Sequence, residues 1–278
     1  MSGEKITTLL LAAGKGSRLQ PLTNHWPKCL MPIGKIALLE HWLMTLSDAK
    51  LNKVLVNLHY LSPVVEEFLS RDRFKSWIDY IYEKELLGTA GTIRENRKFI
   101  GDNTLLLIHA DNWSQCNLEE FIYFHQNLRP KNCPITMMTF KTDSPKSCGI
   151  VDLDESNVVR NFYEKSSNPP GNLANAAIYL IDKEALEWID SHPNHKDFST
   201  EVIPNFIGRI ATWHNINVHR DIGSISNLKN AQKDHTQIQY ERTYILNKCI
   251  NKYIYIPRRC NHVAANQRVN VACPSCTF

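Results

Sequence analysis

The sequence lacks any apolar segment long enough to cross a membrane as a helix. The run near its start, Ile6 to Ala13, is too short to span a bilayer and carries no small-residue cleavage signature. Eight cysteines in a chain without an export signal favour reduced thiols over a disulfide framework. We therefore expect a cytoplasmic protein with no membrane segment.

The sequence also lacks a large excess of charge, low-complexity runs and internal repeats. Its 32 basic and 28 acidic residues leave a net charge of +4, and nothing resembles the clustered basic footprint of a nucleic-acid binder. An anionic partner must therefore be bound locally, at a site. A chain of 278 residues with 43% hydrophobic content can bury one substantial core. We expect a main domain, residues 1–234, and a C-terminal extension, residues 235–278.

Strand and helix patterns alternate in the first half of the chain. Continuous leucine, valine and isoleucine runs are typical of strands covered on both faces, and apolar residues at helical spacing are typical of packed helices. The predicted strands are 6–11, 53–58, 78–83 and 104–109, and the predicted helices are 36–50, 63–70, 89–99 and 118–126. This alternation predicts a parallel sheet wrapped by helices, with a ligand crevice at the carboxyl ends of the strands.

The pattern changes after Pro134, where the segments become shorter and richer in β-branched residues. The predicted strands are 135–140, 149–153, 158–163 and 176–181, and helices resume at 183–190 and 200–207. The whole pattern predicts an α/β fold of Rossmann-like type, with a mixed, mainly parallel sheet flanked by helices. A smaller β-rich part and a C-terminal tail complete the expected architecture.

A glycine-containing loop follows the first predicted strand, in the stretch LLAAGKGSRLQPLTNHWPKCLMPI (residues 10–33). Gly14 and Gly16 allow a sharp turn and a close approach to a ligand, and successive N–H groups can bind an anion. The loop matches neither the GxxxxGK[ST] phosphate loop nor the GxGxxG dinucleotide fingerprint. A plain tight turn would explain the glycines alone, but it would not explain the nearby cations Arg18 and Lys28.

Residues 11–33 closely resemble the signature G-x-G-[ST]-R-[LM]-x-P-[LM]-T-x-x-x-P-K-x-[LM]-x-P of the sugar-1-phosphate nucleotidylyltransferases. The match covers nearly every specified position, and the resemblance continues to about residue 232. It implies that a sugar-phosphate oxygen attacks the α-phosphorus of a nucleoside triphosphate and that pyrophosphate is released. Two polyanions must then be brought together, which requires cations and a metal ion.

The resemblance implies roles for two loops. In that family the glycine loop wraps the triphosphate, and the residues at the Arg18 and Lys28 positions contact its phosphates during transfer. The implied nucleotide-binding residues of the loop are Ala12, Ala13, Gly14 and Gly16. The segment ELLGTAGTI (residues 85–93) resembles the family segment that contacts the base, which implies nucleotide binding by Gly88 and Thr89. A helix cap at these two residues also fits the pattern and does not compete with nucleotide binding.

A third segment, FYEKSSNPPGNLANAAIYLI (residues 162–181), resembles the family's E-K-P…N-x-[AG]-x-Y segment, which binds the sugar and its phosphate. The resemblance implies that Glu164 accepts sugar hydroxyls, that Lys165 holds the phosphate and that Asn175 belongs to the same site. Ser166 replaces the usual proline, and Ala177 stands where glycine is common, so the loop shape is not implied. Without the resemblance, the Glu-Lys pair would be interpreted as a solvated strand end.

Two aspartates are the predicted metal ligands. Asp111 follows a buried strand, and without the resemblance it would be interpreted as a helix cap or a turn residue. Asp221, in VHRDIGSISNL, follows a short strand and resembles the second carboxylate of the family's D-I-G-[TS] motif. Two hard oxygen ligands at distant strand ends suit Mg²⁺. With the resemblance, Arg18, Lys28 and Asp111 are the predicted catalytic residues.

The C-terminal tail carries a second candidate metal site, which nothing in the family signature predicts. Its potential ligands are two pairs, Cys260 with His262 and Cys273 with Cys276. A Cys-x-x-Cys pair is a common half of a tetrahedral zinc site, although the one-residue gap in Cys-x-His is unusual. Structural zinc and unligated side chains both remain consistent with this sequence.

The predicted partners are a nucleoside triphosphate and a sugar 1-phosphate, and neither nucleic acid nor a membrane. The AAGKG and LGTAG segments look most like those of guanylyltransferases for mannose or heptose 1-phosphate, so GTP is the favoured donor. The alternatives are a uridylyltransferase acting on N-acetylmuramate 1-phosphate and a non-catalytic nucleotide-sugar-binding regulatory module. The presence of Arg18, Lys28, Asp111 and Asp221 argues against the regulatory module. The sequence leaves the sugar and the oligomeric state open.

Overall fold

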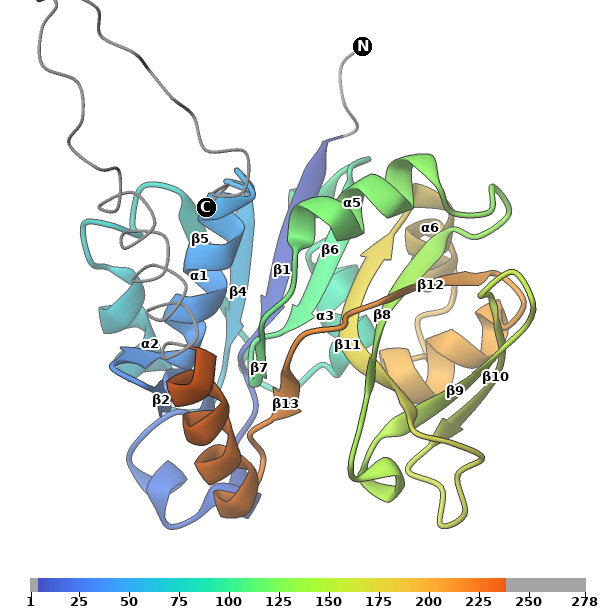
Figure 1. Ribbon diagram of the computed structural model, residues 1–278. Coiled ribbons are helices and arrows are strands. Elements are labelled where there is room, and N and C mark those ends of the chain that lie inside the picture. The colour runs from blue at the N-terminus through green and yellow to red at the C-terminus, as the bar shows by residue number, and fades with distance from the viewer. Residues whose placement is uncertain (1–4, 239–278) are drawn as a thin grey trace, which may run out of the picture. The chain divides into compact units, whose positions relative to one another are not determined.

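A nine-stranded mixed sheet lies at the centre of the structure, a computed structural model that describes residues 5–238 (Figure 1). Four neighbouring strands run parallel, in the order β6 (Thr104–His109), β1 (Ile6–Leu11), β4 (Val54–Leu58) and β5 (Ile78–Tyr82). The apolar interiors of β1, β4 and β6 are almost fully buried, as expected of parallel strands covered on both faces. The loops that follow these four strands therefore meet at one edge of the sheet.

The sheet divides at β11 (Leu173–Ile181). One edge of β11 pairs with β8 (Ile135–Lys141), whereas the other edge pairs first with β9 (Gly149–Leu153) and then with β6. Two further strands, β10 (Val159–Glu164) and β12 (Ile210–His214), extend the arms formed by β9 and β8. All strands of this sheet except β10 and β11 run in the same direction, so the predicted mixed, mainly parallel sheet is confirmed.

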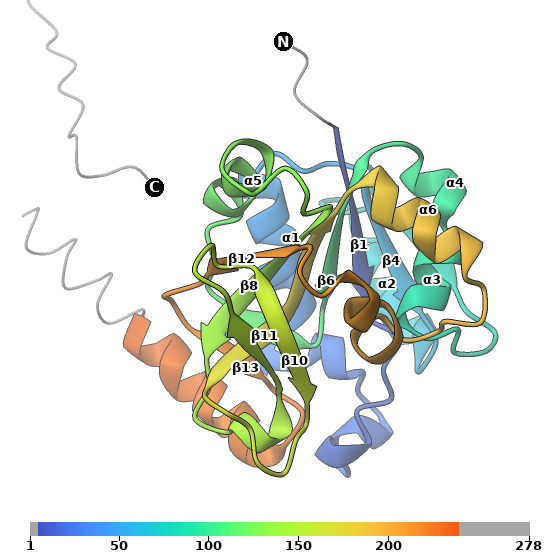
Figure 2. The same cartoon turned by 90° about the vertical axis from the view of Figure 1, so that its right-hand side faces the viewer.

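Helices cover both faces of the parallel strands. Figure 2 shows α1 (Leu38–Asp48) and α5 (Leu118–Asn127) on one side of β1 and β6, and α3 (Thr89–Glu95), α4 (Arg97–Ile100) and α6 (Lys183–Ser191) on the other. A further helix, α2 (Ser62–Leu69), connects β4 to β5. The second face is filled by one apolar cluster, in which leucines of β1 and β6 contact the three helices; its members include Leu9, Leu105, Leu107, Ile93, Ile100, Leu186, Phe198 and Val202. The predicted α/β layers are therefore present.

Short pairs of strands complete the described part of the chain. β7 (Asn112–Ser114) pairs antiparallel with β13 (His219–Asp221), which brings together segments about a hundred residues apart in the sequence. β2 (Pro32–Ile33) and β3 (Ile36–Ala37) form a small hairpin after the glycine loop. These strands have only two or three residues, which is too short to show an alternating pattern.

Two of the predicted helices differ from the structure by more than their end residues. The predicted helix 89–99 is broken at Asn96 into α3 (Thr89–Glu95) and α4 (Arg97–Ile100), because the Asn96 side chain donates to the Thr92 carbonyl at 2.8 Å and competes with the helical ladder. The predicted helix 200–207 is wrong. The chain forms a π-helical turn, Phe198–Val202, and then a 3₁₀ turn, Ile203–Phe206, where Pro204 supplies no N–H for an α-helical ladder.

The predicted C-terminal extension can be described only at its start. A helix begins at residue 225 and continues through residue 238, the last described residue. Cys260, His262, Cys273 and Cys276 lie outside the described residues, so their zinc site stays a prediction, as does the domain boundary after residue 234. No helix within residues 5–238 is long and apolar enough to cross a membrane.

A buried polar cluster joins α5 to the start of α6 (Lys183–Ser191), at the edge of the sheet opposite the loops described above. His125 is fully buried, and its Nε2 lies 2.9 Å from Oδ1 of Asp182, while Arg129 forms an ion pair with the same carboxylate. Burial raises the pKa of Asp182, but the hydrogen bond and charge of His125 and the charge of Arg129 hold it below its ordinary value.

We expect Asp182→Asn to lower the free energy of unfolding by about 2 kcal/mol at pH 7, because Arg129 and His125 lose their charged partner. Since the folded-state pKa of Asp182 is depressed, its contribution is fully present above about pH 4, near the unfolded pKa, and is lost as the pH falls. Urea unfolding of both proteins at pH 7 and at lower pH measures the difference. Equal unfolding midpoints at pH 7 would show that the cluster contributes nothing.

Candidate active site

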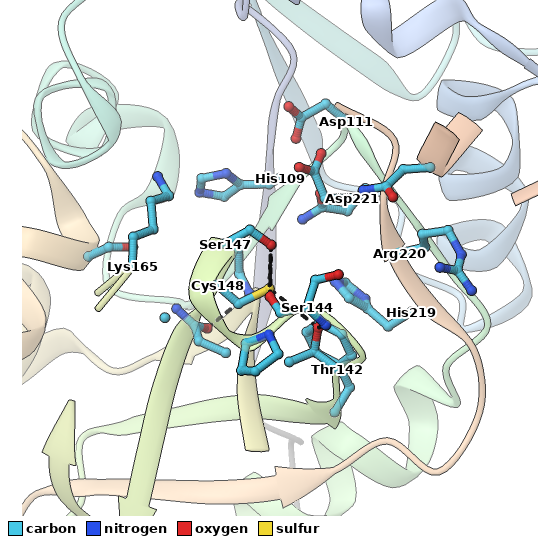
Figure 3. A pocket seen from close by; sticks show the side chains of 18 of the residues that line it. His109, Asp111, Thr142, Ser144, Ser147, Cys148, Lys165, His219, Arg220 and Asp221 are labelled. Atoms are coloured by element: carbon cyan, nitrogen blue, oxygen red, sulfur yellow. Dashed lines mark hydrogen bonds between the residues drawn. The ribbon is translucent and has the colours of Figure 1, made fainter. Parts of the chain in front are cut away.

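A pocket of about 1080 Å³ opens at the carboxyl edge of the sheet, where β6 and β9 separate along β11. Its walls come from the loop after β1, from the ends of β6 and β10, from the connection between β8 and β9, and from β13. Figure 3 shows Asp111 and Asp221 close to each other at one end of the pocket, with Lys165 across it and Ser144, Ser147 and Cys148 along the wall between them. The predicted crevice is therefore where strand topology places it.

Lys28 is the central charge of the site. Its side chain is only 6% exposed, and its Nζ donates to Oδ2 of Asp111 at 2.7 Å and to Oδ1 of Asp221 at 2.8 Å. Burial lowers the pKa of Lys28, but the two carboxylates outweigh it and raise the pKa above its ordinary value. Lys28 therefore stays protonated and provides a fixed positive charge at neutral pH.

The loop around Gly16 lets Lys28 reach this position. Lys28 begins a 3₁₀ turn after Pro27, and Gly16 adopts a left-handed conformation, with φ at 62°. A Cβ atom at Gly16 would lie 3.0 Å from both Cβ of Lys28 and Cγ2 of Thr23, so a larger residue would press on the lysine. Thr23 also donates its hydroxyl to the Gly16 carbonyl at 2.9 Å. The glycine thus serves the packing of Lys28 as well as the turn.

The two aspartates are brought together by the pairing of β7 with β13. Asp111 lies between β6 and β7, and Asp221 ends β13 rather than following it, opposite Asn112 in the antiparallel pair. Burial raises the pKa of Asp111, but the charge of Lys28 and its hydrogen bond hold it below its ordinary value. The Gly223 N–H donates to Oδ1 of Asp221 at 2.8 Å and fixes the orientation of that carboxylate.

The other predicted cation, Arg18, lies at the mouth of the pocket. Its side chain is 70% exposed, and its guanidinium is 3.3 Å from Oδ2 of Asp221. Such an exposed contact contributes little to stability, so the guanidinium is available to an anion that enters the pocket. Arg18, Lys28, Asp111 and Asp221 thus form one connected group, as their predicted roles require.

The three residues predicted to bind the sugar and its phosphate line the same pocket. Glu164 ends β10, and Lys165 follows it with its Nζ 3.3 Å from the Glu164 carboxylate. Asn175 lies on β11, where its amide donates to the Tyr179 hydroxyl at 2.6 Å and accepts from the Ala177 N–H at 2.9 Å. Ala177 has a φ of 54° at the register shift of β11, so the strand bulges where glycine is common in the family.

The predicted nucleotide-binding residues lie at the same edge of the sheet but are not among the residues that line this pocket; they are Ala12, Ala13, Gly14, Gly16, Gly88 and Thr89. Gly88 has a φ of 77°, and a Cβ atom there would lie 2.5 Å from the Lys196 carbonyl oxygen. Thr89 accepts from the Phe198 N–H at 2.6 Å. The Gly88–Thr89 turn is therefore held against the segment around residue 197.

The two carboxylates suit a hard divalent cation, because they converge on one point and remain 31% and 40% exposed. No group of three or more histidine, cysteine or acidic side chains suitable for a metal ion occurs within residues 5–238. The remaining ligands of a cation at Asp111 and Asp221 would therefore be water or substrate oxygens, as Mg²⁺ prefers.

A family model described as nucleotidyl transferase matches residues 7–238, which include every predicted active-site residue. The chain belongs to the nucleotidyl transferase family. The family model and several relatives named as mannose-1-phosphate guanylyltransferases together confirm the predicted similarity to sugar-1-phosphate nucleotidylyltransferases.

Among these nucleotidyl transferases, the chain is 28% identical over 202 residues to a mannose-1-phosphate guanylyltransferase from Mycobacterium tuberculosis, covering 72% of this chain and 55% of the relative. It is 29% identical over 206 residues to the catalytic subunit beta of the mannose-1-phosphate guanylyltransferase of Drosophila pseudoobscura, covering 73% and 54%. It is 30% identical over 182 residues to the bifunctional protein GlmU of Methanocaldococcus jannaschii, covering 66% and 41%. The chain spans about half the length of these relatives.

A solved chain from Bacillus anthracis, assigned as a glucose-1-phosphate thymidylyltransferase and crystallised with a sucrose, has the same fold. The TM-score is 0.72 at 20% identity, and the similarity covers 82% of this chain and 94% of the other. At that identity the comparison supports the fold and leaves the substrate open.

Several pocket residues of this family member were missed by sequence analysis. His109 ends β6 and His219 begins β13; burial lowers the pKa of both, that of His219 to about 4. Both imidazoles are therefore neutral at pH 7 and add hydrogen-bonding capacity without charge. Lys141 and Asp197 also line the pocket. A lone histidine at a strand end carries no sequence signal that separates it from an ordinary core residue.

Proposed function

We propose that the protein transfers a nucleotidyl group from a nucleoside triphosphate, with GTP favoured, to a sugar 1-phosphate of mannose or heptose type. The products are a nucleoside diphosphate sugar and pyrophosphate. One observation carries the proposal: Lys28, Arg18, Asp111 and Asp221 converge at one end of a pocket large enough for a sugar nucleotide, and Glu164, Lys165 and Asn175 line the other part.

In the proposed reaction an oxygen of the sugar phosphate forms a bond to the α-phosphorus of the nucleotide. The bond from that phosphorus to the oxygen leading to the β-phosphorus breaks, and its electron pair leaves with pyrophosphate. Lys28 and Arg18 bind the phosphate oxygens and offset the repulsion between the two anions. Lys165 holds the sugar phosphate, and Glu164 accepts hydrogen bonds from sugar hydroxyls. Catalysis is then a matter of position and charge, without a covalent protein intermediate.

Asp111 and Asp221 would hold Mg²⁺ in this proposal. When bound, the ion supplies additional positive charge for the phosphate oxygens. In the structure described here both carboxylates contact Lys28. Entry of a triphosphate gives Lys28 a new anionic partner, so the carboxylates can contact a cation instead.

The sequence resemblance leaves a second donor open, UTP, with an amino-sugar 1-phosphate such as N-acetylmuramate 1-phosphate as the acceptor. Pyrophosphate release measured over a grid of nucleoside triphosphates and sugar 1-phosphates separates the two proposals. We expect the highest kcat/KM with GTP and mannose or heptose 1-phosphate. A preference for UTP would replace the first proposal by the second, and no release with any pair would contradict both.

A further inference from the structure

Asn57 connects the end of β1 to the end of β4. Its side chain is 3% exposed, and its Oδ1 accepts from the Ala12 N–H at 2.8 Å. Ala12 is the first residue after β1, and the loop with Gly14 and Gly16 begins there. The start of that loop is therefore held by a side chain of the neighbouring strand.

Glu83 continues this connection across the sheet. It follows β5 and is 5% exposed, and its Oε1 accepts from Nδ2 of Asn57 at 3.0 Å and from the Thr92 hydroxyl at 2.6 Å. The Leu87 N–H donates a longer hydrogen bond to its Oε2, with the nitrogen and oxygen 3.4 Å apart. One carboxylate thus connects Asn57 to α3 and to the residue that precedes Gly88.

A buried carboxylate is unfavourable unless its oxygens are hydrogen-bonded or paired with a cation. Glu83 forms no ion pair among those seen within residues 5–238, so these neutral donors are what stabilise it. Apolar residues would fill the same space without this penalty. The network occupies the carboxyl edge of the sheet, between the two loops assigned to the nucleotide.

We propose that Asn57, Glu83 and Thr92 form a positioning network that fixes the loop from Ala12 to Gly16 relative to the Gly88–Thr89 turn. The proposal rests on the proposed function, because it assigns both loops to one nucleotide. The three side chains are 2–5% exposed, so they act through the Ala12 amide and through α3 and not by contact with substrate.

Hydrogen exchange in the full chain tests the network without any substrate. Thr92→Val removes the hydroxyl donor but keeps the size of the side chain. We expect the Ala12 amide, which is far from Thr92 in the sequence, to exchange about tenfold faster in this variant. Unchanged exchange at Ala12 would overturn the proposal.

Thr104→Val is a matched control. Thr104 is also buried, and its hydroxyl donates to a carboxylate that follows a strand, Asp182, at 3.3 Å. It lies at the opposite edge of the sheet. We expect this variant to leave exchange at Ala12 at the parent rate, while thermal unfolding measures the stability lost in each variant. Equal acceleration at Ala12 in both valine variants would mark a general loss of stability and overturn the network.

Kinetics separates positioning from contact with the base. We expect Thr92→Val and Glu83→Gln to raise KM about tenfold for every nucleoside triphosphate that the parent accepts, and to leave KM for the sugar 1-phosphate unchanged. A changed preference among the triphosphates in Glu83→Gln would mark direct base contact and overturn the positioning role. If the parent protein releases no pyrophosphate, the proposed function is contradicted. The hydrogen-exchange experiment needs no substrate, so it still tests whether the network positions the loop.

Discussion

Replacement of Lys28 by alanine is expected to lower the rate of pyrophosphate release by about 10²–10³, the loss seen when one preorganised donor to a developing charge is removed. The ammonium group is held by two carboxylates at 2.7 and 2.8 Å and is nearly buried, so no solvent cation can reproduce its position. Without it, Asp111 and Asp221 would also repel an incoming phosphate. Turnover at saturating substrates, measured beside thermal unfolding, gives the result.

Lys183→Ala is a matched control for Lys28→Ala. Lys183 is likewise close to two carboxylates, Asp102 at 3.0 Å and Glu187 at 3.8 Å, but it is 51% exposed and lies at the start of α6, away from the pocket. We expect this variant to turn over at the parent rate. Arg18→Ala is expected to lose activity to a similar extent as Lys28→Ala, with little change in stability because Arg18 is mostly exposed. Near-normal turnover in both Lys28→Ala and Arg18→Ala would remove these residues from the site.

The second large effect is expected at Asp111, where Asp111→Asn should abolish Mg²⁺-dependent pyrophosphate release. The amide keeps the shape of the side chain but loses the charge that would hold the cation. Release is measured over a titration of Mg²⁺, since a weakened site would first require more of the ion. A variant that matches the parent at limiting Mg²⁺ would show that Asp111 is a turn residue.

Asp182→Asn provides the control for that experiment, because Asp182 also follows a strand but lies at the other edge of the sheet. The two variants are expected to show opposite results. Asp111→Asn should lose activity while it remains folded, and Asp182→Asn should lose stability while its Mg²⁺ dependence matches that of the parent.

The strands that could be predicted best from the sequence are those with continuous apolar runs. Ile6–Leu11 and Thr104–His109 have the predicted bounds, because each contains the continuous apolar run that is typical of a strand buried on both faces. The strands β7 and β12 were not predicted, since their short segments are stabilised by partners distant in the sequence. The prediction of a helix over 200–207 was wrong because it was based on the spacing of apolar residues. That spacing does not take into account that Pro204 lacks the N–H that an α-helical hydrogen-bond ladder needs.

The candidate site was predictable where a long signature named its residues. Lys28, Asp111 and Asp221 are more than eighty residues apart from one another, yet they converge as the resemblance implies. The direct contact between the lysine and both aspartates was not predictable, because it depends on a 3₁₀ turn and on the pairing of β7 with β13. Asn57 and Glu83 were missed for the same reason: a buried amide and a buried carboxylate become meaningful only when folding places them together.

The division of the sheet at β11 has a consequence for how such a protein can diversify. On the proposed function, the donor is held by the loops after β1 and β5, whereas the acceptor is held by residues at the end of β10 and on β11. β10 lies at an edge of the sheet, where a substitution disturbs fewer neighbours than in the parallel core. Substitutions on the arm that contains β10 can therefore change the choice of acceptor while the residues that bind the donor stay the same. Two members of the family can then share a nucleotide and differ in sugar.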